Sequence, residues 1–309
     1  MSRSPSDTRG GKVRFGIDLG GTKIEGVALA PDGVELCRHR RPTPRNNYAA
    51  TIETIASIIG VLEADSGARG SVGIGMPGSL SPKTRLVQNA NSTWLNGRPF
   101  DRDLEAKLSC TIRCANDANC FALSEAADGA AAGTSMVFGV ILGTGCGGGL
   151  VHHGRIVDGP RGIGGEWGHN PLPWCEADEH PGPPCWCGRS GCMETWVSGP
   201  AMAADHFRAT GESLTAEEIA HCASLGKAAA QATLDRHVSR LARGLAAMVN
   251  AFDPDMIVLG GGLSQLAHLY VQLPALISPH IFAADTHVII RPPRWGDASG
   301  ARGAARLWD

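Results

Sequence analysis

Three cysteines and one histidine in the middle of the chain have residue types and a spacing that could hold a metal ion. The cysteines follow a Cys-x-Cys-x₄-Cys pattern, and the histidine precedes them. Three thiolates and one imidazole suit a four-coordinate structural Zn²⁺ with no open position. The N-terminus has no secretory signal, so we expect a reduced, cytoplasmic protein, in which metal explains this set better than disulfides. The predicted ligands are His169, Cys185, Cys187 and Cys192.

The other seven of the ten cysteines are not assigned to this site. Cys175 lies in the proline-rich and acidic loop predicted over residues 171–184, as does His180, and both are left outside the ligand set. The remaining six stand singly and are expected to be small buried hydrophobic residues. They are Cys37, Cys110, Cys114, Cys120, Cys146 and Cys222.

Glycine is unusually frequent, with 41 residues among 309. Four clusters directly follow apolar stretches that read as strands, at residues 20–22, 75–78, 143–149 and 260–262. Glycine-rich turns bring backbone N–H groups close to a ligand, because glycine permits both positive φ and close approach. Several such turns in one chain indicate either binding of nucleotide phosphates or plain turn chemistry.

The type of nucleotide fold follows from what surrounds these turns. The sequence contains no Gly-x-x-x-x-Gly-Lys-Ser/Thr loop, which disfavours a P-loop enzyme. Gly143, Gly145 and Gly148 satisfy the dinucleotide-binding pattern, but that pattern must open a helix. Here it continues into a strand-like segment, Gly149-Leu150-Val151. A phosphate-binding loop between two strands, present in two copies, is instead typical of actin-like ATPases.

The elements that carry these turns are repeated. Phe15, Gly16, Leu19 and Gly20 recur as Phe138, Gly139, Leu142 and Gly143 at a constant offset of 123 residues. The repeat predicts two related α/β lobes, although any two glycine-bounded strands share some likeness. Together with the two phosphate loops, it leads us to expect an α/β fold with two actin-like (ribonuclease H-like) lobes and a cleft between them. The predicted parts are a polar tail (1–13), an N-terminal lobe (14–125), a C-terminal lobe (126–296) with a zinc-bearing loop (159–199), and a helix (297–309) packing back on the first lobe.

Hydrophobic spacing predicts the individual elements. Strands are expected at residues 13–19, 22–29, 72–78, 138–142, 149–151, 256–259 and 287–291, and helices at 49–64, 101–108, 118–128, 226–252 and 298–308.

Charge and hydropathy exclude some classes of function. The 28 Lys and Arg residues nearly balance 30 Asp and Glu, which gives a net charge of -2 and no basic surface for nucleic acid. No stretch approaches the roughly 18 apolar residues of a membrane span. With 43% hydrophobic and 19% charged residues, the composition is that of a soluble globular protein.

Five motifs, in order, resemble the signatures of the ROK family of sugar kinases. They are residues 18–23, 116–118, 143–145, 164–169 and 185–194, and the resemblance runs from about Phe15 to the C-terminus. Two stretches, 89–97 and 165–174, are similar to the proteobacterial fructokinase (manno-fructokinase) branch. Repressor members carry a winged helix before the first strand, and we expect none here because few residues precede that strand.

The resemblance implies roles in phosphoryl transfer from ATP. Asp117 matches the family's catalytic base, although an Asn-Asp-Ala before a helix could equally be a helix cap. Asp18 is expected to hold Mg²⁺ through water or to cap the first turn, and Lys23 to reach a phosphate or remain a solvated charge. The expected ATP-binding residues are Gly16, Ile17, Asp18, Leu19, Gly20, Gly21, Thr22 and Lys23, then Gly143, Thr144, Gly145, Cys146, Gly147, Gly148, Gly149 and Leu150, and finally Gly260, Gly261 and Gly262.

The resemblance also implies how a hexose is held. Its hydroxyls are assigned to Asn91, Asn116, Asp117, Glu166, His169 and Glu194, and the family uses the cysteine and histidine set for zinc. Trp94 and Trp167 could supply an apolar sugar face or simply pack. The expected enzyme is a fructokinase making fructose 6-phosphate, with N-acetylglucosamine, mannose or glucose kinase as alternatives. A non-catalytic sugar-binding regulator and a dinucleotide-dependent reductase are the other classes considered, and the family implies a homodimer.

Overall fold

The computed structural model describes residues 12–309, which divide into two compact units. The first comprises residues 12–124 with Pro160–Gly162 and Ala298–Asp309, and the second comprises Glu125–Gly159 and Ile163–Asp297. Residues 1–11 of the predicted tail lie outside the described residues. Three residues of the predicted zinc-bearing loop, Pro160–Gly162, thus belong with the first unit.

The first unit is built on a five-stranded mixed sheet. Its strands are β1 (Val13–Leu19), β2 (Lys23–Leu29), β3 (Glu35–Pro42), β4 (Gly70–Met76) and β7 (Ile112–Asn116). They lie in the order β3-β2-β1-β4-β7, in which β1, β4 and β7 are parallel while β2 is antiparallel to both of its neighbours. The carboxyl ends of three strands therefore meet at one edge of the sheet.

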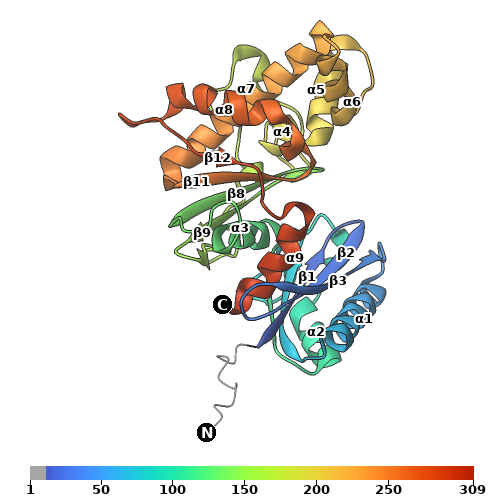
Figure 1. Ribbon diagram of the computed structural model, residues 1–309. Helices are drawn as coiled ribbons and strands as arrows, with labels where there is room; N and C mark the ends of the chain where they lie inside the picture. Colours follow the sequence, from blue (N-terminus) through green and yellow to red (C-terminus); the bar gives the residue numbers. More distant parts are fainter. Residues whose placement is uncertain (1–11) are drawn as a thin grey trace. The chain divides into compact units, whose positions relative to one another are not determined.

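Helices cover both faces of this sheet (Figure 1). On one face, α1 (Tyr48–Ser66) begins at the cap Asn47 and buries the apolar stripe that predicted it, beside α2 (Phe100–Leu108). On the other face lies α9 (Ser299–Ala305), continued by a 3₁₀ turn over Arg306–Trp308. A Cβ atom at Gly73 would lie 1.8 Å from the carbonyl oxygen of Ala304, so α9 approaches the sheet closely because glycine stands there.

Short elements connect β4 to β7. They are β5 (Ser79–Leu80), β6 (Val87–Gln88) and a 3₁₀ turn over Thr93–Leu95, and β5 pairs with β6 in an antiparallel ladder.

The second unit repeats the architecture of the first sheet. Its strands are β8 (Met136–Leu142), β9 (Cys146–His152), β10 (Arg155–Ile156), β11 (Met256–Gly260) and β12 (Ile290–Arg291), in the order β10-β9-β8-β11-β12. Strand β8 is antiparallel to β9 and parallel to β11, as β1 is to β2 and β4. The duplication inferred from the sequence is thus confirmed, and the strand β9 after the glycines excludes the dinucleotide-binding turn.

The helices of the second unit pack around the long helix α7 (Ala228–Phe252). They include α4 (Glu194–Val197), α5 (Gly199–Thr210), α6 (Ala216–Ser224) and α8 (Ala267–Ile277). The helix α3 (Asp117–Ala127) begins in the first unit and ends in the second. Within residues 12–309, no helix combines the length and apolar character needed to cross a bilayer.

Candidate active site and metal centre

Two carboxylates stand at the edge of the first sheet where its parallel strands end. Asp18, near the end of β1, pairs with Gly75 of β4, and Asp117 directly follows β7. Burial, together with the negative charges of Asp18 and Asp117, raises the pKa of the Cys120 thiol well above its usual value. Both carboxylates therefore lie near the same buried thiol. A Cβ atom at Gly300 would lie 2.6 Å from Oδ2 of Asp18, so the start of α9 leaves room for this carboxylate.

Asp117 is the first residue of α3, but its neighbour Asn116 provides most of the cap. Oδ1 of Asn116 accepts from the N–H groups of Ala118 (2.9 Å) and Asn119 (3.4 Å), and its Nδ2 donates to the carbonyl of Gly78 at 3.1 Å. The carboxylate of Asp117 accepts from the N–H of Ala118 at 2.8 Å. The amide of Asn116, predicted to bind sugar, is thus largely engaged by the backbone, and Asp117 keeps acceptor capacity.

The environment of Asp117 makes its carboxylate more basic. Burial raises the pKa of Asp117, against the lowering effect of hydrogen bonds from Ala118, from its own N–H and from the side chain of Asn116. A carboxylate whose pKa is raised toward neutrality is better suited to accept a proton than an ordinary aspartate. This geometry fits the predicted base.

The first glycine hairpin, between β1 and β2, presents only its tip to solvent. Gly21 and Thr22 are exposed and Gly20 is half-buried, with its N–H donating to the carbonyl of Lys23 at 3.0 Å. Nζ of Lys23 lies 3.7 Å from the buried carboxylate of Glu25, so it has a partner within the sheet. Three other residues predicted to bind ATP, Gly16, Ile17 and Leu19, are buried strand residues that pack in the sheet and, at Gly16, against α9.

The second glycine hairpin, between β8 and β9, has the same form. Gly143, Thr144 and Gly145 form an accessible tip, closed by a bond from the N–H of Gly143 to the carbonyl of Gly145 at 3.0 Å. Gly147 is half-buried, whereas Cys146, Gly148, Gly149 and Leu150 are buried within β9.

Trp167 explains why a glycine is needed at position 148 of β9, away from the tip. Its indole Nε1 donates to the carbonyl of Gly147 at 3.0 Å, and a Cβ atom at Gly148 would lie 2.6 Å from its ring. Trp167 is 1% exposed and stacks edge to face with Phe138. It packs in the core, so of the two readings of this tryptophan the structure supports packing.

A cavity of about 820 Å³ lies in the second unit beside the tip of its glycine hairpin. The N–H of Gly199, at the start of α5, donates to the carbonyl of Gly143 at 2.9 Å, which joins the hairpin to this helix. The volume lies in the range typical of cofactor pockets. The lining residues are Gly143, Thr144, Gly199, Pro200, Ala203, Thr215, Ala216, Glu217, Ala220, Gly262, Leu263, Gln265 and Leu266.

Most of these lining residues were not predicted from the sequence, which pointed only to Gly143, Thr144 and Gly262. The others come from the starts of α5 and α6 and from the 3₁₀ turn after β11. Local signals for the two helix starts exist, since Ser198 precedes Gly-Pro and Thr215 forms a capping box with Glu218.

Two further carboxylates lie at the base of the second hairpin. Oε2 of Glu194 accepts from the N–H of Cys146 at 3.0 Å, and its Oε1 accepts from Nε1 of Trp186 at 2.7 Å. Burial and the negative charges of Glu194 and Glu166 raise the pKa of the Cys146 thiol well above its usual value, so both carboxylates are close to it. Of the residues assigned to sugar, Glu166, His169 and Glu194 thus belong to one region of the second unit. Asn91 is exposed in the first unit, between β6 and the turn over Thr93–Leu95.

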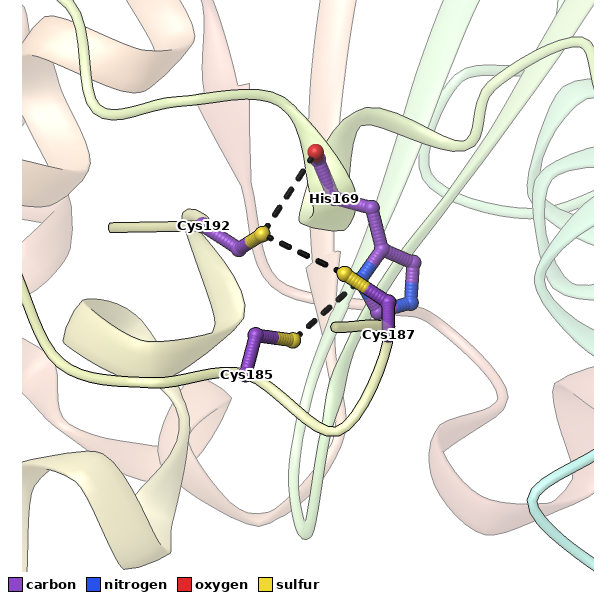
Figure 2. Close-up of side chains that lie close together, drawn as sticks. All are labelled: His169, Cys185, Cys187 and Cys192. Atoms are coloured by element: carbon purple, nitrogen blue, oxygen red, sulfur yellow. Dashed lines mark hydrogen bonds between the residues drawn. The ribbon is translucent and has the colours of Figure 1, made fainter. Parts of the chain in front are cut away.

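The predicted metal ligands converge, as Figure 2 shows. Nδ1 of His169 lies 3.6 Å from Sγ of Cys185, and Sγ of Cys187 lies 3.6 Å from Sγ of Cys192. All four ligand atoms lie within 4.8 Å of one another. A tetrahedral site with Zn–S bonds of about 2.3 Å has edges of about 3.8 Å. The donor set and its spacing therefore fit a closed four-coordinate zinc site, while Cys175 is exposed and bonds to the carbonyl of Leu172.

An ionic clamp ties the loop before the cysteines to α7. Glu179, 4% exposed, accepts from Nε of Arg240 at 2.8 Å and from both terminal nitrogens of Arg243 at 2.6 and 2.7 Å. Arg243 also donates to the carbonyl of Trp174 at 2.7 Å. Burial alone would raise the pKa of Glu179, but the bonds from Arg243, the N–H of Glu176 and Arg240 prevail and lower it from 4.5 to about 2.

Replacing Glu179 with glutamine should lower the free energy of unfolding by about 3–5 kcal/mol, because Arg243 would be left buried without its counter-charge. Since the folded pKa is lowered, the difference from the unchanged protein should be complete above pH 4.5 and shrink as the pH falls toward 2. Chemical denaturation at several pH values measures this. Asp178→Asn, an exposed neighbour, is the matched control; equal stability of both variants would disprove the clamp.

Comparison with known proteins gives consistent matches. Residues 14–309 match the ROK family. The N-acetyl-D-glucosamine kinase of Photobacterium profundum is 40% identical, over 95% of this chain and 98% of the relative, and that of Pectobacterium atrosepticum is 39% identical over the same shares. Among solved structures, a ROK hexokinase from Thermus thermophilus superposes with a TM-score of 0.84 at 31% identity, covering 95% of this chain and 97% of that one. A ROK family glucokinase from Streptomyces griseus, in complex with glucose and AMPPNP, gives 0.77 at 25% identity, covering 96% and 98%.

These matches confirm the actin-like α/β fold and do not support the fructokinase branch expected from residues 89–97 and 165–174. The second stretch contains Glu166, Trp167 and His169, which serve hairpin packing, the metal cluster and the polar region beside them. These roles lie in packing and in the Cys/His cluster, so this stretch does not distinguish the fructokinase branch from other members of the family.

Proposed function

The chain belongs to the ROK family, and we propose that it is an N-acetyl-D-glucosamine kinase that phosphorylates the 6-hydroxyl of the sugar. It is an ATP-dependent sugar kinase of actin-like fold, and the identity of the sugar is the proposed part. The observation that carries this choice is the 40% identity to an N-acetyl-D-glucosamine kinase over 95% of the chain. The likeness of residues 89–97 and 165–174 to fructokinases is confined to short stretches, whereas this identity extends over nearly the whole chain.

In this proposal Asp117 accepts the proton of the attacking hydroxyl. The sugar oxygen forms a bond to the γ-phosphorus of ATP, the bond to the β–γ bridging oxygen breaks, and ADP leaves with that electron pair. The raised pKa of Asp117 supports this role. Asn116 is given a positioning role, because its amide holds the start of α3 and the turn at Gly78.

The nucleotide is assigned to the cavity of the second unit. The tip of the hairpin and Gly262 offer backbone N–H groups for phosphates, and Leu263 and Leu266 offer apolar surface for a base. Mg²⁺ bound with ATP neutralises phosphate charge. Asp18, a carboxylate at the sheet edge, is the residue we assign to hold it through water.

Within the second unit, the sugar is assigned to Glu166, His169 and Glu194, and within the first unit Asn91 and Asp117 are the residues that the family resemblance implies. Carboxylates accept hydrogen bonds from ring hydroxyls, and Glu194 is held in place for this by Cys146 and Trp186. The cluster of His169 with three cysteines would hold a structural zinc, which supplies no chemistry to the reacting atoms but fixes the segments beside Glu166 and Glu194.

The test measures ADP release from Mg-ATP with N-acetylglucosamine, N-acetylmannosamine, glucose, mannose and fructose at equal concentrations. We expect the highest kcat/KM with N-acetylglucosamine. A higher value with fructose would overturn the sugar assignment and keep the kinase class, whereas no sugar-dependent ADP release would overturn both.

A further inference from the structure

A second cluster of metal-ligating side chains lies in the first unit, apart from the residues used above. Cys37 and His39 are two residues apart on β3, so their side chains point to the same face of the strand. This is the face that α1 covers, and Asp65 stands in the last turn of that helix. Cys37 packs at the edge of the hydrophobic core, as expected from the sequence, but it is half-buried and also has two polar neighbours.

The three side chains form a compact group. Nε2 of His39 lies 2.6 Å from Oδ2 of Asp65. One ligand atom each from Cys37, His39 and Asp65 lie within 4.8 Å of one another. The thiol of Cys37 makes one long contact, 3.9 Å to the carbonyl of Leu62. None of the three is fully buried, so an ion can reach the group from solvent.

The charges around the group favour a cation. Of the two acidic groups near Cys37, Asp65 belongs to the group itself, whereas Glu35 is paired with Arg38 at 2.6 Å and lies 3.7 Å from Arg302. The nearest arginine in sequence, Arg38, points to the other face of β3 and is engaged by Glu35 at 2.6 Å and by the buried Glu25 at 3.1 Å. Its charge is therefore compensated.

We propose that Cys37, His39 and Asp65 form a second metal site, which binds Zn²⁺ through one thiolate, one imidazole and one carboxylate. A sulfur, a nitrogen and an oxygen ligand suit this borderline-soft ion and not Mg²⁺ or Ca²⁺, which take oxygen ligands. With three protein ligands, the fourth position is left to water. The bound ion ties the edge strand β3 to α1.

The site differs in strength from the cysteine cluster of the second unit. That cluster supplies four ligands, three of them thiolates, whereas this one supplies three, of which one is a thiolate. The second zinc therefore binds more weakly and exchanges with the medium while the first stays bound. A plain hydrogen bond between His39 and Asp65, with Cys37 as a bystander, is the competing account.

The experiment titrates ZnCl₂ into the zinc-loaded full chain and counts bound zinc by native mass spectrometry and calorimetry. We expect the unchanged protein to bind a second equivalent of zinc. In Cys37→Ser and in His39→Ala, the affinity for this second zinc should fall by more than the roughly 10–100-fold that follows loss of an outer hydrogen-bond partner. Asp65→Asn should weaken it as well. Cys110→Ser, which removes an exposed cysteine of the same unit, is the matched control and should bind two equivalents of zinc.

A spectroscopic readout separates a thiolate ligand from a bystander. Co²⁺ added to the zinc-loaded protein should give thiolate-to-metal charge-transfer absorption that is absent in Cys37→Ser and retained in Cys110→Ser. Unfolding curves without added metal check that each variant is folded. The proposal is overturned if the unchanged protein binds one zinc only, or if the second equivalent keeps its affinity in folded Cys37→Ser and His39→Ala.

Discussion

Replacing Asp117 with asparagine should lower kcat for the preferred sugar by about 10²–10⁴-fold, the usual loss when a general base is removed. The substitution keeps an oxygen at the position that accepts from the N–H of Ala118, so the start of α3 is preserved. Asn116 continues to cap the helix. The lost rate therefore reports the missing proton acceptor and not a displaced helix.

The pH dependence of kcat/KM for the unchanged enzyme and for Asp117→Asn gives an independent test of the base role. Asp117 must be unprotonated to accept a proton, and burial raises its pKa above the ordinary 3.8. The kcat/KM of the unchanged enzyme should therefore fall as the pH is lowered through this raised pKa, at a higher pH than for an ordinary aspartate. This acidic limb should be absent from the residual activity of Asp117→Asn.

The measurements are ADP release across pH and sugar affinity by calorimetry. Asp32→Asn, an exposed carboxylate in the turn between β2 and β3, is the control and should keep full activity. Sugar affinity within a few-fold of the unchanged enzyme would place the defect in the chemical step. A kcat reduced less than tenfold in a folded Asp117→Asn would reject the base assignment and leave the kinase class standing.

Seven of the ten strands in the two sheets were predictable from local apolar patterns, whereas β3, β7 and β10 were not among the expected strands. The repeat of Phe15, Gly16, Leu19 and Gly20 at an offset of 123 residues marks the same position in both copies, and β1 and β8 do occupy equivalent central positions. Helices α1 and α7 carry long apolar stripes at helical spacing, which are strong signals. The convergence of His169 with Cys185, Cys187 and Cys192 was predictable because the three cysteines lie within eight residues.

The roles of individual glycines were harder to predict, since a glycine for ligand approach and a glycine for packing look alike in sequence. Gly16 was expected at the nucleotide, yet it lies against α9, a helix far along the chain. Gly148 likewise makes room for Trp167. Only the tips, at Gly21 and Gly145 for example, keep accessible backbone.

Contacts between distant segments were also beyond the sequence. Nothing in the loop around Glu179 indicates that this carboxylate is buried against two arginines of α7, more than sixty residues later. The cavity wall formed by α5 and α6 depends in the same way on how these helices lie against the hairpin. At residues 116 and 117, local pattern allowed either residue to cap α3, and hydrogen-bond geometry decided for Asn116.

Removal of the predicted zinc should weaken sugar binding through the contacts that join Trp186 to Glu194. Trp186 stands between Cys185 and Cys187, and its Nε1 donates to Oε1 of Glu194 at 2.7 Å. The opposite oxygen of Glu194 is held by the N–H of Cys146 at 3.0 Å. Without the metal, the segment that carries Trp186 loses its ligand bonds, and Glu194 keeps one of its two anchors.

Cys187→Ser should therefore abolish near-stoichiometric zinc in this cluster and lower kcat/KM for the sugar by roughly 10–100-fold, as expected when the partners that orient a site are lost. Most of the loss should appear as a raised KM for the sugar, with the KM for ATP little changed, because the cavity lining contains no residue of the cysteine segment. Cys175→Ser is the matched control. This exposed thiol lies outside the cluster, so the variant should keep both zinc and activity.

Zinc retained in Cys187→Ser would refute the ligand set. Zinc lost with an unchanged sugar KM would refute the route through Trp186 and Glu194, because a cluster that merely stabilised the loop would change the unfolding midpoint and leave sugar binding intact.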